Sequence, residues 1–288
     1  MVIFKKIQDI KDFICVQNPM QRKPGFIPTM GALHAGHLSL VEKARADGML
    51  VVCSIFVNPT QFNDKADFEK YPISIEADIE LLINAGCDVL FLPSVSEMYP
   101  DGESAIKTYD FGYLDTILEG SKRPGHFRGV GQVVARLLEI IEPHRLYLGQ
   151  KDYQQCMVIR KLVGMMVPIA IGMELEVIVC PTVREADGLA MSSRNRRLTE
   201  PQRIVAGVIY QCLISIETKQ NTSSFDIVRK ECEDILASKG FVTEYVALAD
   251  ARNLELLNNY RKDTPMVALI AARIGEIRLI DNILLKSE

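Results

Sequence analysis

The chain has 288 residues, of which 48% are hydrophobic and 24% charged, and its formal net charge is −4. The length suffices for one large or two ordinary domains. The acidic balance argues against a general nucleic-acid binder, because such proteins gain affinity from many Lys and Arg side chains at phosphates. Seven cysteines without a C-x-x-C pair indicate buried thiols in a reducing compartment. The longest apolar stretch, residues 163–173, is too short to span a bilayer. We therefore expect a cytoplasmic protein that binds neither nucleic acid nor a membrane.

Apolar, β-branched runs alternate with helical periodicity over the first 180 residues. This alternation predicts strands at 25–29, 50–57, 88–92, 145–149 and 175–180, and helices near 37–47, 74–85, 129–142 and 152–166. Because the strands are apolar throughout, both faces of their sheet should be covered by helices. The expected fold over residues 1–182 is α/β, a Rossmann-like doubly wound parallel sheet. Ligands of such sheets bind beyond the carboxyl ends of the strands.

After residue 182 the pattern changes. Thr199 and Gln202 form a capping-box sequence, which predicts one long helix over 199–218. A second helix is predicted near 223–239, and short strands follow at 243–250, 265–274 and 276–281. A helix pair followed by a small antiparallel sheet predicts a smaller α+β domain at 183–288.

The most informative local pattern is a histidine pair, His34 and His37, where the strand at 25–29 passes into a helix. Gly31 and Gly36 allow a ligand to approach the backbone, and a helix start offers unpaired N–H groups to an anion. Two imidazoles at this spacing share one face and can donate hydrogen bonds to phosphate oxygens. The pair could equally be half of a metal site or two solvated cap residues, so the motif alone leaves the question open.

Two further loops carry groups suited to phosphates. In the segment 148–155, Lys151 can meet a phosphate, and Asp152 can either bond a ribose hydroxyl or cap the following helix. In the segment 191–195, serine hydroxyls and the Arg194 guanidinium can surround a triphosphate, although a plain polar cap region has the same composition.

Two other segments suit a substrate. Asn58 and Gln61 offer uncharged amides that can orient a hydroxy acid, or they belong to a plain turn that starts at Asn-Pro. Arg123, His126 and Arg128 precede an apolar helix, whose start is expected to face a phosphate or substrate. The sequence "GVGQVV" in that helix lacks the third glycine of a dinucleotide-binding loop.

These segments together resemble a known family. "HAGH" (34–37) is similar to the His-x-Gly-His signature of the adenylylating nucleotidyltransferases. The blocks "FIPTMGALHAGHLSLV", "SIFVNPTQF", "GHFRGVGQVV", "YLGQKDYQQ" and "VREADGLAMSSRN" resemble, in this order, the pantothenate synthetases. The resemblance reaches from residue 26 to residue 195, and "MSSRN" corresponds to the mobile phosphate loop of the wider superfamily, with Arg194 in place of its second lysine.

The resemblance implies an ATP-dependent, amide-forming ligase that condenses (R)-pantoate with β-alanine through a pantoyl adenylate, releasing AMP and pyrophosphate. It also implies a homodimer and Mg²⁺ bound with the ATP phosphates, with Asp78 as a candidate ligand. The catalytic residues that it implies are His34, His37, Lys151, Ser192, Ser193 and Arg194. The ATP-binding residues are Met30, Gly31, Ala32, Leu33, His34, Ala35, Gly36, His37, Gly149, Gln150, Lys151, Asp152, Val183, Met191, Ser192, Ser193 and Arg194. The residues for pantoate and β-alanine are Pro28, Met30, Asn58, Gln61 and Gln155.

Four alternatives compete with this interpretation. A tRNA synthetase fragment would share the signature, but it is expected to carry a basic face, which this acidic chain lacks. A cofactor adenylyltransferase would also share the signature, but it would not need an amine substrate. An NAD(P)-dependent oxidoreductase is disfavoured by the missing glycine fingerprint. A non-catalytic nucleotide sensor would bind ATP without exchanging pyrophosphate.

Overall fold

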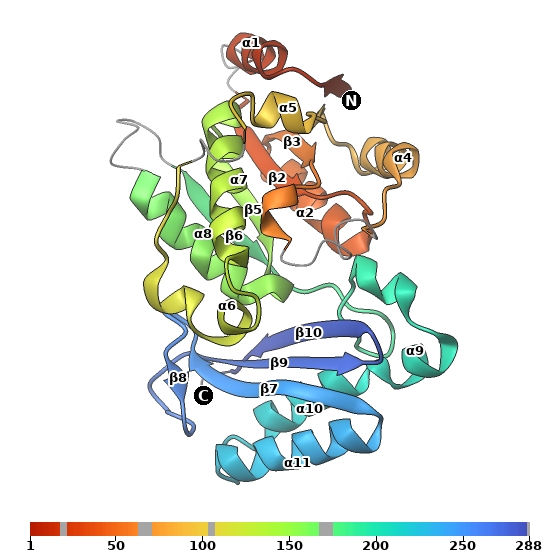
Figure 1. The fold of residues 1–288 in the computed structure, drawn as a ribbon, viewed down its shortest axis with the longest axis vertical. Helices are drawn as coiled ribbons and strands as arrows, with labels where there is room; N and C mark the ends of the chain where they lie inside the picture. The colour runs from red at the N-terminus through yellow and green to blue at the C-terminus, as the bar shows by residue number, and fades with distance from the viewer. Residues whose placement is uncertain (18–21, 63–70, 103–106, 167–174, 287–288) are drawn as a thin grey trace. The chain divides into compact units, whose positions relative to one another are not determined.

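The computed structural model describes residues 1–17, 22–62, 71–102, 107–166 and 175–286. The chain divides into two compact units, one formed by residues 1–149 and 154–180 and the other by residues 150–153 and 181–288 (Figure 1). Residues 150–153, which the sequence pattern groups with the first domain, thus pack with the second unit. Part of the apolar stretch 163–173 lies outside the described residues. No helix in the described part of the chain is long and apolar enough to cross a membrane.

The first unit is built on a six-stranded sheet in the order β1-β4-β3-β2-β5-β6, in which every pairing is parallel. Its strands are β1 (Val2–Phe4), β2 (Pro24–Thr29), β3 (Leu50–Ile55), β4 (Val89–Phe91), β5 (Arg145–Gly149) and β6 (Glu176–Cys180). All residues of β3 are buried, including Ser54, as its largely apolar sequence predicts. The predicted parallel sheet is confirmed. The sequence pattern missed only β1, a short edge strand whose first two residues are exposed.

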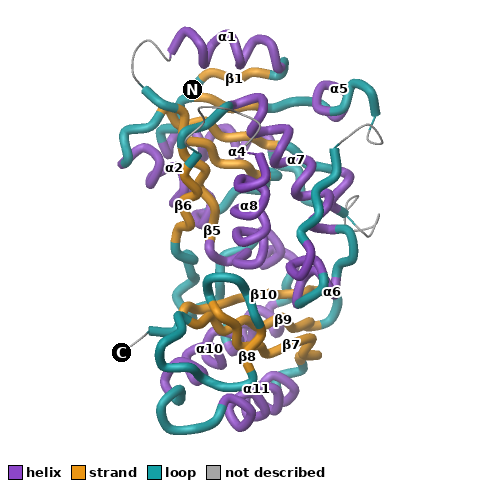
Figure 2. The backbone as a smooth tube through the Cα atoms, turned by 90° about the vertical axis from the view of Figure 1, so that its left-hand side faces the viewer, coloured by secondary structure: helices purple, strands orange, loops and turns teal. Residues whose placement is uncertain are grey.

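Helices cover both faces of this sheet. They are α1 (Ile7–Gln17), α2 (Ala35–Ala46), α4 (Ile75–Ala85), α5 (Val95–Met98), α6 (Leu118–Lys122), α7 (His126–Ile141) and α8 (Tyr153–Met166), with 3-10 turns η2 (Pro59–Gln61) and η4 (Gly112–Asp115). Figure 2 shows α2 on one side of the strands and α7 and α8 on the other. The core between α2 and the sheet contains Leu40, Val41 and Ala44 against Val51 and Cys53.

The sheet contains a topological switch point. β3 and β4 follow β2 on one side of it, whereas β5 and β6 lie on the other side. In open α/β sheets, ligands bind at the carboxyl ends of the two strands that flank such a point. β2 ends at Thr29, just before the histidine segment, and β5 ends at Gly149. The strand order therefore places the start of the histidine segment and the end of β5 at the edge of the sheet where a ligand is expected.

The second unit is α+β. It contains the 3-10 turns η5 (Gln150–Asp152) and η6 (Ser193–Arg197) and the helices α9 (Glu200–Ala206), α10 (Val208–Thr218) and α11 (Phe225–Ser238). Its antiparallel sheet has the order β10-β9-β7-β8, with β7 (Phe241–Asp250), β8 (Leu256–Leu257), β9 (Met266–Ile274) and β10 (Ile277–Leu284). The predicted capping box starts α9, where the Thr199 N–H donates to Gln202 Oε1 at 3.0 Å.

The prediction of one long helix over 199–218 is wrong, because the helix is interrupted at Gly207 between α9 and α10. A Cβ atom at residue 207 would lie 2.9 Å from the Asp187 carbonyl oxygen. The glycine therefore allows the backbone at Asp187 to lie close to the end of α9.

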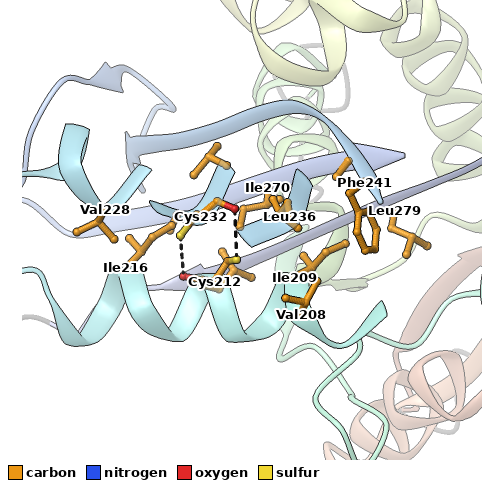
Figure 3. Packing of buried hydrophobic residues seen from close by; sticks show 14 of the residues in the cluster. Val208, Ile209, Cys212, Ile216, Val228, Cys232, Leu236, Phe241, Ile270 and Leu279 are labelled. Atoms are coloured by element: carbon orange, nitrogen blue, oxygen red, sulfur yellow. Dashed lines mark hydrogen bonds between the residues drawn. The ribbon is translucent and has the colours of Figure 1, made fainter. Parts of the chain in front are cut away.

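The core of the second unit lies between the helix pair and the sheet. Figure 3 shows Ile216 of α10 beside Val228 of α11 and Cys212 beside Cys232, with Ile270 of the sheet near Leu236. The Sγ atoms of Cys212 and Cys232 donate to each other's backbone carbonyls at 3.8 and 3.6 Å. These buried thiols agree with the sequence-based expectation. Cys15, by contrast, is exposed.

Candidate active site

The loop between β2 and α2 has a strained backbone that a buried carboxylate holds in place. Gly31 and Ala32 have φ angles of +80° and +50°. The Asp78 carboxylate on α4 accepts hydrogen bonds from the N–H groups of Ala32 at 2.9 Å and Leu33 at 2.8 Å. A Cβ atom at Gly31 would lie 3.0 Å from Asp78 Oδ2. Glycine and a carboxylate are therefore both needed for this loop to turn into α2.

Asp78 is the residue proposed from the sequence as a metal ligand. Its side chain is buried, with 1% exposed, and its Oδ1 also accepts a hydrogen bond from Ser74 Oγ at 3.2 Å. Within the described residues, no group of three or more His, Cys, Asp and Glu side chains could hold a metal ion. The contacts of Asp78 make it an anchor of the loop, and its role toward a metal stays a prediction.

The two histidines of the signature lie side by side. His34 has an extended backbone and caps α2, with its Nδ1 accepting from the Gly36 N–H at 3.2 Å. In the neutral ring the proton therefore lies on Nε2. The ring centroids of His34 and His37 are 4.0 Å apart, with a 39° angle between the planes. His34 therefore caps the helix, which was one of the alternatives left open by the sequence. Its ring also lies next to that of His37 at the start of the helix.

The two amides after β3 lie beside this loop. Asn58 and Gln61 are buried, and Asn58 Nδ2 donates to Gln61 Oε1 and to the Gly129 carbonyl, both at 3.3 Å. Gln61 Nε2 lies 2.8 Å from Met30 Sδ. The structure therefore brings together three of the residues predicted for the acid substrate, Met30, Asn58 and Gln61.

His126, which the sequence analysis expects to face a phosphate or substrate, makes a contact with the backbone of η2. The side chain is buried, with 6% exposed, and Nδ1 lies 2.9 Å from the Gln61 carbonyl oxygen, which can only accept. The ring is therefore protonated at Nδ1, and Arg123 Nη1 reaches Nε2 at 3.0 Å. His126 holds the backbone of η2 in place. Its expected role toward a phosphate or substrate stays a prediction.

Pro28 and Gln155 are the remaining residues predicted for the acid substrate. Pro28 lies within β2, opposite Ser54 of β3. Gln155 lies in the first turn of α8 and is partly exposed. Its neighbour Gln154 is buried and donates to the carbonyls of Leu114 and Ile117 at 2.7 and 3.0 Å.

In the second unit, Asn282 of β10 holds the turn that contains Lys151. Asn282 Nδ2 donates to the carbonyls of Gln150 and Lys151 at 3.0 and 2.8 Å, and Gln150 Nε2 donates back to Asn282 Oδ1 at 3.2 Å. Asn282 is only 2% exposed, and the Lys151 ammonium lies 3.5 Å from the Asp152 carboxylate. No local sequence signal identifies Asn282, because its partners are more than a hundred residues away.

The serine segment is also well anchored. Ser192 caps η6, and its Oγ accepts from the Arg194 N–H at 3.3 Å, while Ser193 is buried. The Met191 N–H donates to the Val183 carbonyl at 3.0 Å, which joins two further residues predicted to bind ATP.

An ion pair holds Arg184, which precedes this segment and forms an isolated β-bridge with Ala190. Arg184 makes two hydrogen bonds to the Asp281 carboxylate, at 2.5 and 3.0 Å, and its guanidinium lies 4.0 Å from the Tyr210 ring centroid. Burial raises the pKa of Asp281, and the bonds from Arg184 oppose that rise.

Comparison with known proteins identifies the family. The profile of the pantoate–β-alanine ligases matches residues 2–284, which is nearly the whole chain. The chain belongs to the pantoate–β-alanine ligase family. Among its curated relatives, the pantothenate synthetase of Cytophaga hutchinsonii is 43% identical over 288 residues and that of Bacteroides fragilis 42% over 284 residues. The aligned regions cover 99% of both chains in the first case and 98% of both in the second.

Solved structures of the family agree with the fold. The pantothenate synthetase of Thermus thermophilus superposes with a TM-score of 0.89 at 39% identity, covering 98% of this chain and 99% of that one. The pantoate–β-alanine ligase of Francisella tularensis, described in complex with β-γ ATP and β-alanine, has a TM-score of 0.80 at 38% identity and covers 99% of this chain and 97% of that one. The Rossmann-like α/β fold with a smaller second sheet is thus that of the ligase family.

Proposed function

We propose that this ligase condenses (R)-pantoate with β-alanine to form pantothenate, using ATP and releasing AMP and pyrophosphate. Membership of the family over nearly the whole chain supports the activity, as does the Francisella relative that binds β-γ ATP and β-alanine. The structural observation that carries the proposal is the grouping of the paired imidazoles, the Asp78-held loop and the Asn58–Gln61 amides around the carboxyl end of β2.

The chemistry explains why ATP is needed. A carboxylate does not react with an amine at neutral pH, because the oxide is a poor leaving group. The pantoate carboxylate attacks the α-phosphorus of ATP, which expels pyrophosphate and forms pantoyl adenylate. The amine of β-alanine then attacks the acyl carbon and expels AMP. No covalent enzyme intermediate is required, so the protein must position the reactants and stabilise the developing charge.

The roles of individual residues follow from this task. His34 and His37 donate hydrogen bonds to the phosphates during adenylyl transfer. Lys151 and the segment Ser192–Arg194 neutralise the charge on the departing pyrophosphate. Further nucleotide contacts are assigned to Met30 to Leu33, Ala35, Gly36, Gly149, Gln150, Asp152, Val183 and Met191.

The acid substrate is proposed to lie beside Met30, with the amides of Asn58, Gln61 and Gln155 as its hydrogen-bond partners and Pro28 lining the site. A divalent cation, Mg²⁺, accompanies the ATP phosphates and needs few protein ligands. We also propose that the enzyme is a cytoplasmic homodimer, as the family resemblance suggests. Light scattering on the purified protein tests the dimer.

ATP–pyrophosphate exchange tests the first half-reaction. Exchange should depend on pantoate and should be absent with other hydroxy acids and amino acids, and AMP release should require β-alanine. His37→Ala should lower exchange roughly 10²-fold or more. The matched control is His144→Ala, since His144 lies just before β5, at the opposite end of the strands, beside Lys23. Unchanged exchange in His37→Ala would contradict the assigned role of this ring.

A further inference from the structure

A buried tyrosine outside the sequence motifs makes a hydrogen bond to the Asn58–Gln61 amide pair, which is proposed to bind the acid substrate. Tyr99 directly follows α5, and its hydroxyl donates to Asn58 Oδ1 at 2.9 Å. The residue is 6% exposed, and its ring packs edge-on against Phe56, with centroids 6.0 Å apart. Neither end of this side chain can move without disturbing the core of the first unit.

The partners of Asn58 determine which way its amide points. The Thr60 N–H can only donate, and it faces Asn58 Oδ1 at 3.4 Å. The Gly129 carbonyl can only accept, and it faces Nδ2 at 3.3 Å. Tyr99 supplies the shortest bond to Oδ1. The Thr60 hydroxyl oxygen lies 3.2 Å from Oδ1 and 3.0 Å from Nδ2, and since a hydroxyl can donate or accept, it fits either end of the amide. The oxygen end is therefore held by donors and the nitrogen end by acceptors, as an oriented amide requires.

This orientation passes to the neighbouring amide. Because Asn58 Nδ2 donates to Gln61 Oε1, the Nε2 end of Gln61 is turned toward Met30. A reversed Gln61 would present its carbonyl oxygen instead, and that oxygen would repel the carboxylate of an acid substrate, which can only accept hydrogen bonds. The Gln61 backbone is held independently, through the contact of its carbonyl with His126.

We propose that Tyr99 is a positioning residue for the acid substrate. Its hydroxyl fixes the Asn58 amide, Asn58 fixes the Gln61 amide, and Gln61 then presents N–H groups to pantoate. The inference rests on the proposed role of Gln61 as a pantoate ligand. Tyr99 itself does not touch the substrate, so its effect should fall on pantoate and spare ATP.

Tyr99→Phe removes the hydroxyl and keeps the ring. We expect the KM for pantoate in pyrophosphate exchange to rise roughly 3- to 10-fold, which is the effect of losing one hydrogen bond that orients a ligand. The KM for ATP should stay unchanged. Tyr109→Phe is the matched control, because Tyr109 is also a buried tyrosine of the first unit and lies outside the Asn58 network. Equal changes in both KM values would indicate general loosening and overturn the proposal.

A double-mutant cycle with Gln61→Ala distinguishes the positioning role of Tyr99 from the proposed pantoate site at Gln61. If Tyr99 acts through Gln61, Tyr99→Phe adds nothing further in the Gln61→Ala background. Additive effects would overturn the positioning role. A normal pantoate KM in Gln61→Ala would instead contradict the proposed pantoate site itself. An impaired Gln61→Ala beside a normal Tyr99→Phe would contradict Tyr99 alone.

A second variant, which leaves Tyr99 in place, tests whether the orientation of the Asn58 and Gln61 amides affects pantoate binding. Asn58→Asp keeps an acceptor for Tyr99 but turns an oxygen toward Gln61 Oε1, which favours reversal of the Gln61 amide. We expect a larger rise in the pantoate KM than in Tyr99→Phe, again with the ATP KM unchanged. A pantoate KM equal to that of the unmodified enzyme would show that amide orientation does not matter and would overturn the proposal.

Discussion

Replacing Asp78 by asparagine tests whether this buried carboxylate anchors the loop before α2. The carboxylate accepts two backbone N–H groups, from Ala32 and Leu33, with one bond on each oxygen. Asparagine has nearly the same shape but must turn an NH₂ group toward one of these donors. One charge-assisted hydrogen bond is therefore lost, one buried N–H is left facing another donor, and the remaining bond becomes neutral.

The expected size of the effect follows from these contacts. A hydrogen bond to a charged group contributes about 1.5–3 kcal/mol, and the neutral bond that remains is weaker by up to about 1 kcal/mol. We expect Asp78→Asn to lower the free energy of unfolding by about 2–4 kcal/mol, less than the whole stability of a typical domain. Pyrophosphate exchange should fall by roughly 10²-fold, because the histidine pair follows directly from the displaced loop.

Urea denaturation of the nucleotide-free protein in a chelator measures the loss of stability, and pyrophosphate exchange measures activity. Ser74→Ala is the control, because it removes only the 3.2 Å bond from Ser74 Oγ to Asp78 and should cost less than about 1 kcal/mol. The reasoning is refuted if Asp78→Asn unfolds at the same urea concentration as the parent. In that event, a changed dependence of exchange on Mg²⁺ would make Asp78 a metal ligand instead.

The other predictions concern Asn282, Gly129 and Asp47. Asn282→Asp turns an oxygen toward two buried carbonyls of the turn after β5, so the ATP KM should rise roughly 10-fold with an unchanged pantoate KM. A methyl group at Gly129 would lie 2.7 Å from the Cα of Gln61, so Gly129→Ala should cost about 1–3 kcal/mol in urea denaturation and raise the pantoate KM. The hydrogen bond from Lys43 is the main cause that lowers the pKa of Asp47 in the folded protein. This carboxylate therefore stabilises the fold above its unfolded pKa of about 3.9 and loses that effect as the pH falls. The stability difference between Asp47→Asn and the parent should shrink between pH 7 and pH 3.

Local patterns in the sequence predicted most of the regular structure. Largely apolar runs predicted β3 and β5 to within two residues, and the Thr199–Gln202 pair correctly marked the start of α9. These features depend on side chains close together in the chain, which is why periodicity and capping residues reveal them. The break at Gly207 was missed, and the close approach of Asp187 to this glycine joins residues twenty positions apart, which periodicity does not reveal.

The histidine pair shows where sequence information ends. The spacing of His34 and His37 predicted that the two rings share one face, and the neighbouring motifs pointed to a nucleotide. The anchors of the site could not be predicted in this way. Asp78, Tyr99 and Asn282 each bond to residues more than forty positions away, so their partners depend on which strands and helices become neighbours. An Asp on a helix or an Asn in a strand looks like many others in the sequence. Only folding brings each of them, buried, against the backbone or amide group that it holds.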